Sequence, residues 1–423
     1  MKGKRIVVLF VVLLLSIMVV AKVPIKFSFW GSQAEIDKVK LLKETFEAQN
    51  PDIEIILEHI PGNEYEQKLM IEAVAGNAPD VQTIREVSFM YLTMSNYYLP
   101  LDSLIKKFDL NLEDFYPNLL EMYKYNGKIY ALPREFTPVV TYYNKAMFDE
   151  AGLEYPSGDW TWNDFLKVCK ALTKDTDGDG EIDQYGVFMV PWDALYLPLL
   201  FTNDANILTE DGRKSRLLDP NTIEAFQFAY DLIHKYKVAP PLDEANTYGW
   251  INGFAQKKFA MIFQGRWATP IYLQIKDFEW GVAPIPYNKK RVTVMYSSGF
   301  GISAQSKHPE EAFRWIAFLV SEEGQKIWGG SDALVVPANR KVAESDNFIT
   351  PDVLPKNDQL FLDEAKNYGQ VPPRTPSFAM MYQIVDRYLN EIFIGLRTVE
   401  DGLKAADKEL QKMLDRSWKR LGF

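Results

Sequence analysis

The sequence predicts an α/β protein built from two domains. Strand and helix patterns alternate between residues 25 and 84, which favours parallel strands joined by right-handed crossovers. A chain of 423 residues is longer than one compact domain of ordinary size. Hydrophobic residues make up 47% of the chain and charged residues 25%, as in a folded globular protein, so each domain can bury its own core.

The first 21 residues have the pattern of a secretory signal. Lys2, Lys4 and Arg5 precede the uncharged apolar run 6–15, and residues 19–21 offer a small-residue cleavage site. The run is near the lower limit for spanning a bilayer, so the segment is either removed or retained as an anchor. No cysteine follows the site, so no lipid anchor of the usual kind is expected. The protein is predicted to be periplasmic or secreted.

The charge balance is acidic. The formal net charge is −10, and removal of the three cations of residues 1–21 takes it to about −13. A nucleic-acid partner is therefore not expected. The only cysteine, Cys169, lies in the apolar-periodic run 165–172 and is interpreted as a buried helix residue, which excludes an intramolecular disulfide.

Five elements open the mature chain in the order strand, helix, strand, helix, strand, at about residues 25–29, 34–47, 53–57, 65–75 and 81–84. In sheets of this kind, ligands bind beyond the carboxyl ends of the strands. Five residues fall at such ends and are expected to face a cleft: Trp30, Gly31, Ser32, Arg85 and Glu86.

Residues 125–162 alternate quickly between strand, loop and helix signals, which indicates a crossing between the two domains. Strands are expected at 128–132 and 139–143, with Pro133 ending the first of them. The intervening loop would present three polar side chains to a ligand, those of Arg134, Glu135 and Thr137.

Helix starts are marked by capping residues in three places. Asn144 precedes a short helix, and Thr161 precedes another with Asp164 at its third position, which is the pattern of a capping box. Thr398 is expected to cap a final helix that runs from Val399 to Trp418.

Several motifs occur together in a characteristic order. The crossing segment combines a GK-x-Y-x-x-P strand, the run Y-Y-N-K and a P-x-x-x-x-TW helix start; F-x-F-W-G, N-P-D-I-E-I, G-N-A-P-D-V and L-P-L-D precede it, and F-x-x-x-K-x-A-M-x-x-x-G-x-W follows. Together they resemble the extracellular solute-binding proteins of ABC importers, and among these the maltose-binding-protein-like sugar binders.

The resemblance implies a two-lobed periplasmic-binding-protein fold, type II-like, each lobe a mixed sheet flanked by helices. The N-terminal lobe would comprise 22–135 and about 285–335, and the C-terminal lobe 136–284 and about 336–423. Crossings near 125–141, Pro284 and Ser331 would form the hinge. The implied function is capture of a mono- or oligosaccharide between the lobes and its delivery to a membrane permease, by a monomer.

The second half of the chain adds further candidates. In the related sugar binders an aromatic residue at this position stacks on the ligand, so the resemblance makes Trp192 a candidate. The alternative is that Trp192 forms a hydrophobic staple over the helix start. Trp267 matches a position that stacks on sugar. The remaining candidates are Asp193, Trp250, Gln264, Arg266, Ser298, Gly299, Arg374 and Phe378. The glycine permits close backbone approach to a ligand.

An acidic loop follows the predicted helix at 165–172. Its residues 175–186 resemble a calcium loop of the EF-hand type, but Gly186 stands where the EF-hand places its bidentate Glu. Either the loop binds a structural Ca²⁺ or it is a solvated surface turn. The candidate ligands are Asp175, Asp177, Asp179, Glu181, Asp183 and Gln184.

A secreted glycoside hydrolase is the rival function, because carboxylates and rings in a cleft serve both classes. Glu86, Glu135 and Asp193 could supply a catalytic pair, but nothing in their context marks an acid and a nucleophile. None of the three histidines has ligand or triad spacing, and no nucleophile or phosphate-loop motif occurs. The protein is therefore predicted not to be an enzyme and to need no catalytic cofactor.

Two features bear on the ligand. Aromatic residues are 14% of the chain, and ring faces suit the apolar faces of sugars, although extra core packing would account for any single ring. Four arginines fall at predicted cleft positions, Arg85, Arg134, Arg266 and Arg374. They would either hold the carboxylate of a uronate bidentately or pair with Glu and Asp of the protein.

Overall fold

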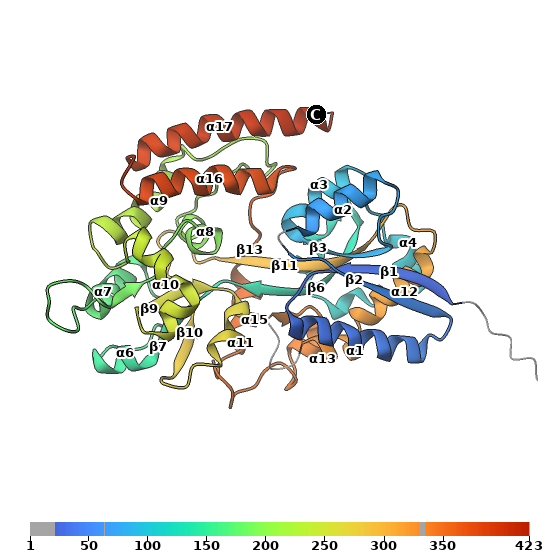
Figure 1. The fold of residues 1–423 in the computed structure, drawn as a ribbon, viewed down its shortest axis with the longest axis horizontal. Coiled ribbons are helices and arrows are strands. Elements are labelled where there is room, and N and C mark those ends of the chain that lie inside the picture. Colours follow the sequence, from blue (N-terminus) through green and yellow to red (C-terminus); the bar gives the residue numbers. More distant parts are fainter. Residues whose placement is uncertain (1–21, 63, 330–334, 423) are drawn as a thin grey trace, which may run out of the picture.

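The computed structural model of the chain describes residues 22–62, 64–329 and 335–422, arranged as two lobes side by side along the long axis (Figure 1). Each lobe is a mixed sheet flanked by helices, as expected. The predicted signal at 1–21 and most of the crossing near Ser331 lie outside these ranges. Within them, no helix combines the length and apolar character needed to cross a bilayer.

The first sheet has the strand order β12-β6-β11-β3-β1-β2, with β13 beside one end of β11. Its first three strands in sequence are parallel, as the alternation of strands and helices predicts, whereas β11 runs antiparallel to β3 and β6. The strands are β1 (Val23–Phe29), β2 (Ile53–His59), β3 (Val81–Arg85), β6 (Ala131–Pro138), β11 (Thr293–Ile302), β12 (Val336–Pro337) and β13 (Gly369–Gln370).

The second sheet has four strands in the order β10-β7-β9-β8, of which only the β8–β9 pair is parallel. A small hairpin, β4 (Lys124–Tyr125) with β5 (Lys128–Ile129), stands apart from both sheets. The strands of the second sheet are β7 (Val140–Asn144), β8 (Tyr185–Val187), β9 (Phe259–Gln264) and β10 (Trp280–Ala283).

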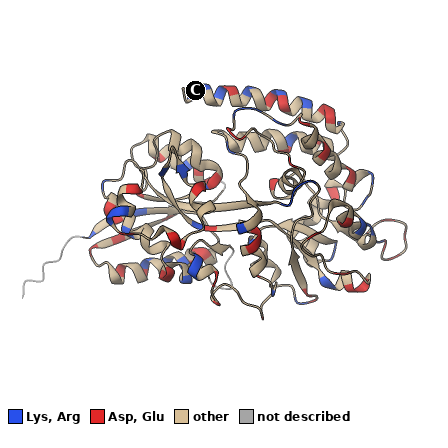
Figure 2. Cartoon of the chain, turned by 180° about the vertical axis from the view of Figure 1, so that it is seen from behind, with Lys and Arg blue, Asp and Glu red and all other residues tan. Residues whose placement is uncertain are grey.

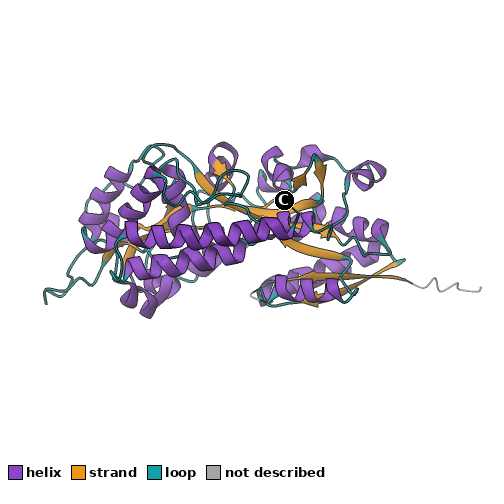
Figure 3. Cartoon of the chain, turned by 90° about the horizontal axis from the view of Figure 1, so that it is seen from above, coloured by secondary structure: helices purple, strands orange, loops and turns teal. Residues whose placement is uncertain are grey.

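Helices cover both sheets, and the last two lie side by side over the middle of the molecule (Figures 1 and 3). The first lobe carries α1 (Gln33–Gln49), α2 (Tyr65–Val74), α3 (Glu86–Met94), α4 (Asp102–Lys107), η1 (Leu112–Asp114), α5 (Pro117–Met122), α12 (Pro309–Leu319), α13 (Glu322–Trp328) and α14 (Arg340–Ala343). The other helices are α6 (Lys145–Glu150), α7 (Trp162–Leu172), α8 (Asp193–Thr202), α9 (Pro220–His234), α10 (Leu242–Ala255), η2 (Arg266–Ala268), α11 (Thr269–Tyr272), α15 (Gln359–Tyr368), α16 (Phe378–Phe393) and α17 (Val399–Arg420).

The predicted caps are confirmed. The Asn144 side chain accepts a hydrogen bond from the Met147 amide, and Thr398 accepts one from Asp401. Thr161 and Asp164 form the expected capping box at the start of α7. Cys169 is fully buried in the same helix, as predicted.

The prediction that Pro133 ends a strand is wrong. Strand β6 continues through Pro133 to Pro138, so Arg134, Glu135 and Thr137 lie within a buried strand and not in a loop. The pairing with β11 shifts register at this point, because Pro133 faces Gly299 while Glu135 faces Ser298. Arg134 is the extra residue of this β-bulge. A strand tolerates the missing N–H of a proline at a bulge, so β6 continues through Pro133.

The crossing predicted in this region is tight. A single residue, Val139, separates β6 in the first sheet from β7 in the second, and its amide donates to the carbonyl of Val294 on β11. Two buried strands are thereby held end to end across the junction between the lobes.

Candidate functional site

A cavity of about 370 Å³ lies between the two lobes. Ten of the eighteen candidate ligand-binding residues line it: Trp30, Arg85, Glu86, Glu135, Thr137, Trp192, Asp193, Trp267, Ser298 and Phe378. On one side they come from β3, β6 and β11, from the residue after β1 and from the start of α3; on the other side they come from the start of α8, from η2 and from α16. Cavities of about 300–1,000 Å³ at domain interfaces are typical of small-molecule sites.

The first-sheet wall holds Arg85, the last residue of β3, and Trp30, which follows β1. The Arg85 guanidinium lies 4.9 Å from the centre of the Trp30 ring and donates to the carbonyl of Gly62 at 2.9 Å. Its Nε is 3.5 Å from Glu66, so the cation already has a carboxylate partner in the protein.

Glu135 is the best-anchored carboxylate of this wall. Its Oε1 accepts from the Ser298 hydroxyl at 2.7 Å and lies 2.7 Å from Nη2 of Arg134, and its Oε2 accepts from the Trp328 indole at 2.7 Å. Arg134 also stacks on the Trp328 ring, 4.2 Å from its centre. These three contacts fix the position of the Glu135 carboxyl at the cavity surface.

Glu86 lies beside it at the start of α3, with a different environment. Burial raises the pKa of its carboxyl to about 7, although the Ser297 amide donates to it at 3.2 Å and the charges of Arg374 and Arg85 favour the ionised form. At neutral pH this group therefore exchanges a proton more readily than an ordinary glutamate does.

The opposite wall presents aromatic rings. Trp192 and Trp267 have ring centres 6.5 Å apart, and Tyr296 meets Trp267 edge to face at 5.6 Å. The Trp267 indole N–H donates to Oε1 of Gln264 at 2.6 Å, which fixes the ring plane. Trp192 precedes α8 without capping it through its side chain and lines the cavity, so its ring is available to a ligand.

Asp193 follows Trp192 and is the carboxylate of this wall. Burial raises the pKa of its carboxyl, and the Tyr296 hydroxyl donates to its Oδ2 at 2.8 Å. Within the described ranges no ion pair includes Asp193, in contrast to Glu135.

The other eight candidates lie outside the cavity lining. Ser32 caps α1 in a capping box with Glu35, and a Cβ on Gly31 would fall 2.8 Å from Glu35. Gly299 packs against the Tyr123 ring at the β-bulge. Trp250 contacts Trp192 from behind, with ring centres 5.9 Å apart, and Gln264 holds Trp267. Gly31, Ser32, Gly299, Trp250 and Gln264 therefore lie around the cavity, and the remaining three are arginines.

Three of the four candidate arginines are paired with carboxylates of the protein. Arg266 is 1% exposed and lies 3.1 Å from Asp358, Arg134 pairs with Glu135, and Arg85 with Glu66. Arg374 differs, because its buried Nε and Nη2 have no hydrogen-bond partner among the described residues. It lies behind Glu86 and not at the cavity surface.

Seven lining residues were not predicted from the sequence: Val87, Phe136, Ala194, Tyr296, Ser297, Val335 and Tyr382. Two of them carry a signal that could have been used. Tyr296 lies two residues before Ser298 and so faces the same side of β11, and Tyr382 lies one turn after Phe378 on α16.

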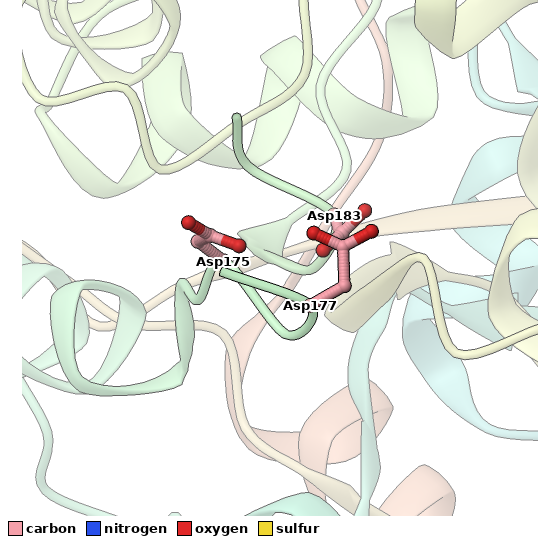
Figure 4. Close-up of side chains that lie close together, drawn as sticks. All are labelled: Asp175, Asp177 and Asp183. Atoms are coloured by element: carbon pink, nitrogen blue, oxygen red, sulfur yellow. The ribbon is translucent and has the colours of Figure 1, made fainter. Parts of the chain in front are cut away.

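The acidic loop brings together three of its six candidate ligands. Oxygen atoms of Asp175, Asp177 and Asp183 lie within 4.8 Å of one another (Figure 4). Asp175 accepts from the amides of Gly178 and Gly180, and hydrogen bonds from Thr176 lower the pKa of Asp183. Gln184 does not fit the predicted shell, because it is buried and donates to the Leu172 carbonyl at 2.7 Å.

The family model of the bacterial extracellular solute-binding proteins matches residues 30–326. The chain belongs to this family. A maltotriose-binding protein of Pyrococcus abyssi is 28% identical over 89% of this chain and 80% of its own length, and a multiple sugar-binding protein of Streptococcus mutans is 24% identical over 76% and 77%.

Solved structures of similar proteins share the fold of this solute-binding protein. An ABC substrate-binding protein of Listeria monocytogenes in complex with cycloalternan superposes with a TM-score of 0.83, at 25% identity over 93% of this chain and 99% of that one. A maltose-bound protein of T. maritima gives 0.75, at 23% identity over 92% and 100%. The fold is thus the two-lobed periplasmic-binding-protein fold, as predicted.

Membership also bears on the choice between binder and enzyme. The proteins of this family are substrate-binding components of ABC transporters and not enzymes, as predicted, so a secreted glycoside hydrolase is not favoured.

Proposed function

We propose that this solute-binding protein captures a neutral mono- or oligosaccharide in the cavity between its lobes and delivers it to the permease of an ABC importer. The observation that carries the proposal is the pairing of ring surfaces on one wall, Trp192 and Trp267, with buried acceptors on the other, Glu86 and Glu135. Rings meet the apolar faces of a pyranose, and carboxylates accept hydrogen bonds from its hydroxyls. The sugar-binding relatives support the same ligand class.

The charges of the cavity favour a neutral ligand over a uronate. Three carboxylates and one arginine line it, and that arginine, Arg85, is already paired with Glu66. A ligand carboxylate would meet Glu86, Glu135 and Asp193 without a free guanidinium to hold it. We therefore propose a neutral saccharide, and a uronate is the alternative that the titration tests.

Calorimetric titration tests the ligand class. The panel comprises maltose- and arabinose-type oligosaccharides, free hexoses, an inositol as the polyol, and galacturonate oligomers. We expect heat from neutral saccharides and none from the galacturonates. Heat from galacturonates alone would refute a neutral ligand, and hydrolysis of any oligosaccharide would return the glycosidase alternative.

We propose further that the lobes close on the ligand by bending at the crossings, which include residue 139 and residues 284–292. The ligand would stabilise the closed form through contacts with both walls, and the permease would recognise that form. X-ray scattering with and without saturating saccharide should give a smaller radius of gyration for the complex. Superimposable curves would contradict hinge closure, and the same data would show whether the protein is the monomer we expect.

The family is described as extracellular, and we propose that residues 1–21 direct export. Amino-terminal sequencing of the exported protein should begin near Lys22. A chain that retains Met1 in the membrane fraction would instead indicate an uncleaved anchor.

We propose that Asp175, Asp177 and Asp183 hold a structural Ca²⁺, because their convergence supplies the hard oxygen ligands that this ion prefers. Ca²⁺ in millimolar amounts should raise the melting temperature, and a chelator should lower it. The pair Asp175→Asn and Asp177→Asn should abolish the difference without changing saccharide affinity. Equal melting temperatures for the unmodified protein in both conditions would indicate a plain surface turn.

A further inference from the structure

We propose that the groove between α16 and α17 is a docking site for an acidic amphipathic helix of a partner protein. The proposal rests on the proposed function, which supplies a partner protein, the membrane permease. The groove lies outside the ligand cavity, has a volume of about 890 Å³ and is lined by residues of these two helices and by Ser377 before α16.

The charge of the groove points to an acidic partner. Lys408, Lys412, Arg416 and Arg420 occupy every fourth position of α17 and line the groove, so they form one stripe along the helix. Within the described ranges, no ion pair or hydrogen bond joins these four side chains to another residue. The one acidic lining residue, Glu409, is already paired with Arg387 at 2.5 Å.

This concentration of cations contrasts with the whole chain, whose net charge is −10. Both Lys or Arg and Asp or Glu occur along α17 in Figure 2, at the outer edge of the molecule, but only one of these acidic residues lines the groove. Unpaired cations facing one groove repel each other, and an acidic partner would relieve that repulsion.

The shape of the groove favours a helix over a flat lipid surface. Lining residues on α17 extend from Ala405 to Arg420, a span of about 22 Å at 1.5 Å per residue, which is the length of a helix of about four turns. Met380 is 51% exposed and contributes apolar surface to the groove, whereas Ile384 and Met413, which also line it, are only 5% and 6% exposed. An apolar strip bordered by charge is the usual receptor for an amphipathic helix.

Helix α16 lines both the groove and the ligand cavity. Phe378 and Tyr382 of this helix line the cavity, while Met380, Ile384 and Arg387 of the same helix line the groove. A partner helix in the groove would therefore contact the element that also contacts bound saccharide.

The test uses a fluorescent peptide of about 16 residues, helical, with Glu on one face and Leu on the other. Anisotropy titration with the full protein should show binding that weakens as salt rises from ~50 to ~200 mM. The double variant Lys412→Glu/Arg416→Glu should bind at least ~10-fold more weakly. The matched control Lys106→Glu/Lys128→Glu makes the same change of charge at exposed sites on α4 and β5 and should bind normally.

Equal binding by all three proteins, or no binding by any, would overturn the proposal. A second arm uses vesicles of phosphatidylcholine with and without phosphatidylglycerol. If the unmodified protein sediments with the anionic vesicles, the double variant does not, and the peptide is not bound, the partner of the groove is a lipid surface and not a helix. Saccharide titration of the double variant should give the same affinity as the unmodified protein. The saccharide hypothesis and the groove hypothesis can therefore fail independently.

Discussion

The two walls of the cavity hold buried carboxylates in opposite ways. On the first-sheet wall, Glu135 has an arginine, a hydroxyl and an indole N–H as partners. On the other wall, the side-chain donor to Asp193 is a tyrosine hydroxyl, and burial raises the pKa of its carboxyl. One wall therefore holds its carboxylate in an ion pair, whereas on the other wall burial disfavours the charged form of Asp193.

The difference follows from where each residue lies. Glu135 is on a central strand next to a β-bulge, which places Arg134 beside it and Ser298 opposite. Asp193 is the first residue of α8. The other residues of this helix are all buried and include no Lys or Arg, so the helix offers Asp193 no cationic partner. Under the proposed function, the first wall would orient ligand hydroxyls, and the second would offer ring surfaces with one carboxyl acceptor.

The largest expected effect is on the paired carboxylate. Glu135→Leu leaves the buried Arg134 without its closest partner, and removing one partner of a buried ion pair costs about 3–5 kcal/mol. The free energy of unfolding, measured by denaturant titration, should fall by about that amount. Glu113→Leu, an exposed carboxylate in η1, is the control and should change it little. Unchanged stability of Glu135→Leu would mean that Glu35, 3.5 Å from Arg134, suffices as its partner.

Glu86 should make stability depend on pH. Its folded pKa of about 7 lies above the ordinary 4.5, so the folded protein binds the proton more tightly than the unfolded chain does. Stability from this group is full below pH 4.5 and is lost as pH rises through 7. Glu86→Gln removes the dependence, so its unfolding free energy relative to the unmodified protein should gain about 2.5 kcal/mol between pH 5 and pH 8. Parallel pH profiles would show that the carboxyl titrates normally.

These contrasts also show what the sequence could and could not predict. The caps at Thr161 and Thr398 and the strands β1 to β3 depend on nearby residues, so local patterns predicted them. The local rule that proline ends a strand failed at Pro133, because the bulge opposite Gly299 compensates for the proline.

The candidate site was limited by long-range partners. Arg266 lies at a strand end, as a cleft residue should, yet its charge is taken by Asp358, which is 92 residues away in sequence. Tyr382 lines the cavity because of how α16 docks, and nothing in the helix sequence fixes that orientation. Strand ends located the cavity, but only the folded chain separates lining residues from supporting ones.

The ring wall should dominate affinity. Trp267→Ala removes a platform that Gln264 holds in place, and loss of a stacked ring of this kind costs about 2 kcal/mol or more. Calorimetry with the saccharide found in the panel should show affinity lower by about 30-fold. Tyr155→Ala, which removes a ring that is 42% exposed and does not line the cavity, is the control and should bind as the unmodified protein does. Equal affinity of the two variants would indicate that the ligand does not contact this wall.

The smallest effect is expected for Asp193→Asn, and it tests the comparison most directly. No cation of the described chain is paired with Asp193, so its neutralisation removes the cost of burying a charge and keeps an oxygen for the Tyr296 hydroxyl. The unfolding free energy at pH 8 should change by less than about 1 kcal/mol or rise slightly, in contrast to the loss expected for Glu135→Leu. Affinity for a neutral saccharide should fall only modestly, because an amide oxygen still accepts from a hydroxyl. A stability loss as large as that of Glu135→Leu would show that the two walls hold their charges alike, since it would require a cationic partner for Asp193 in solution.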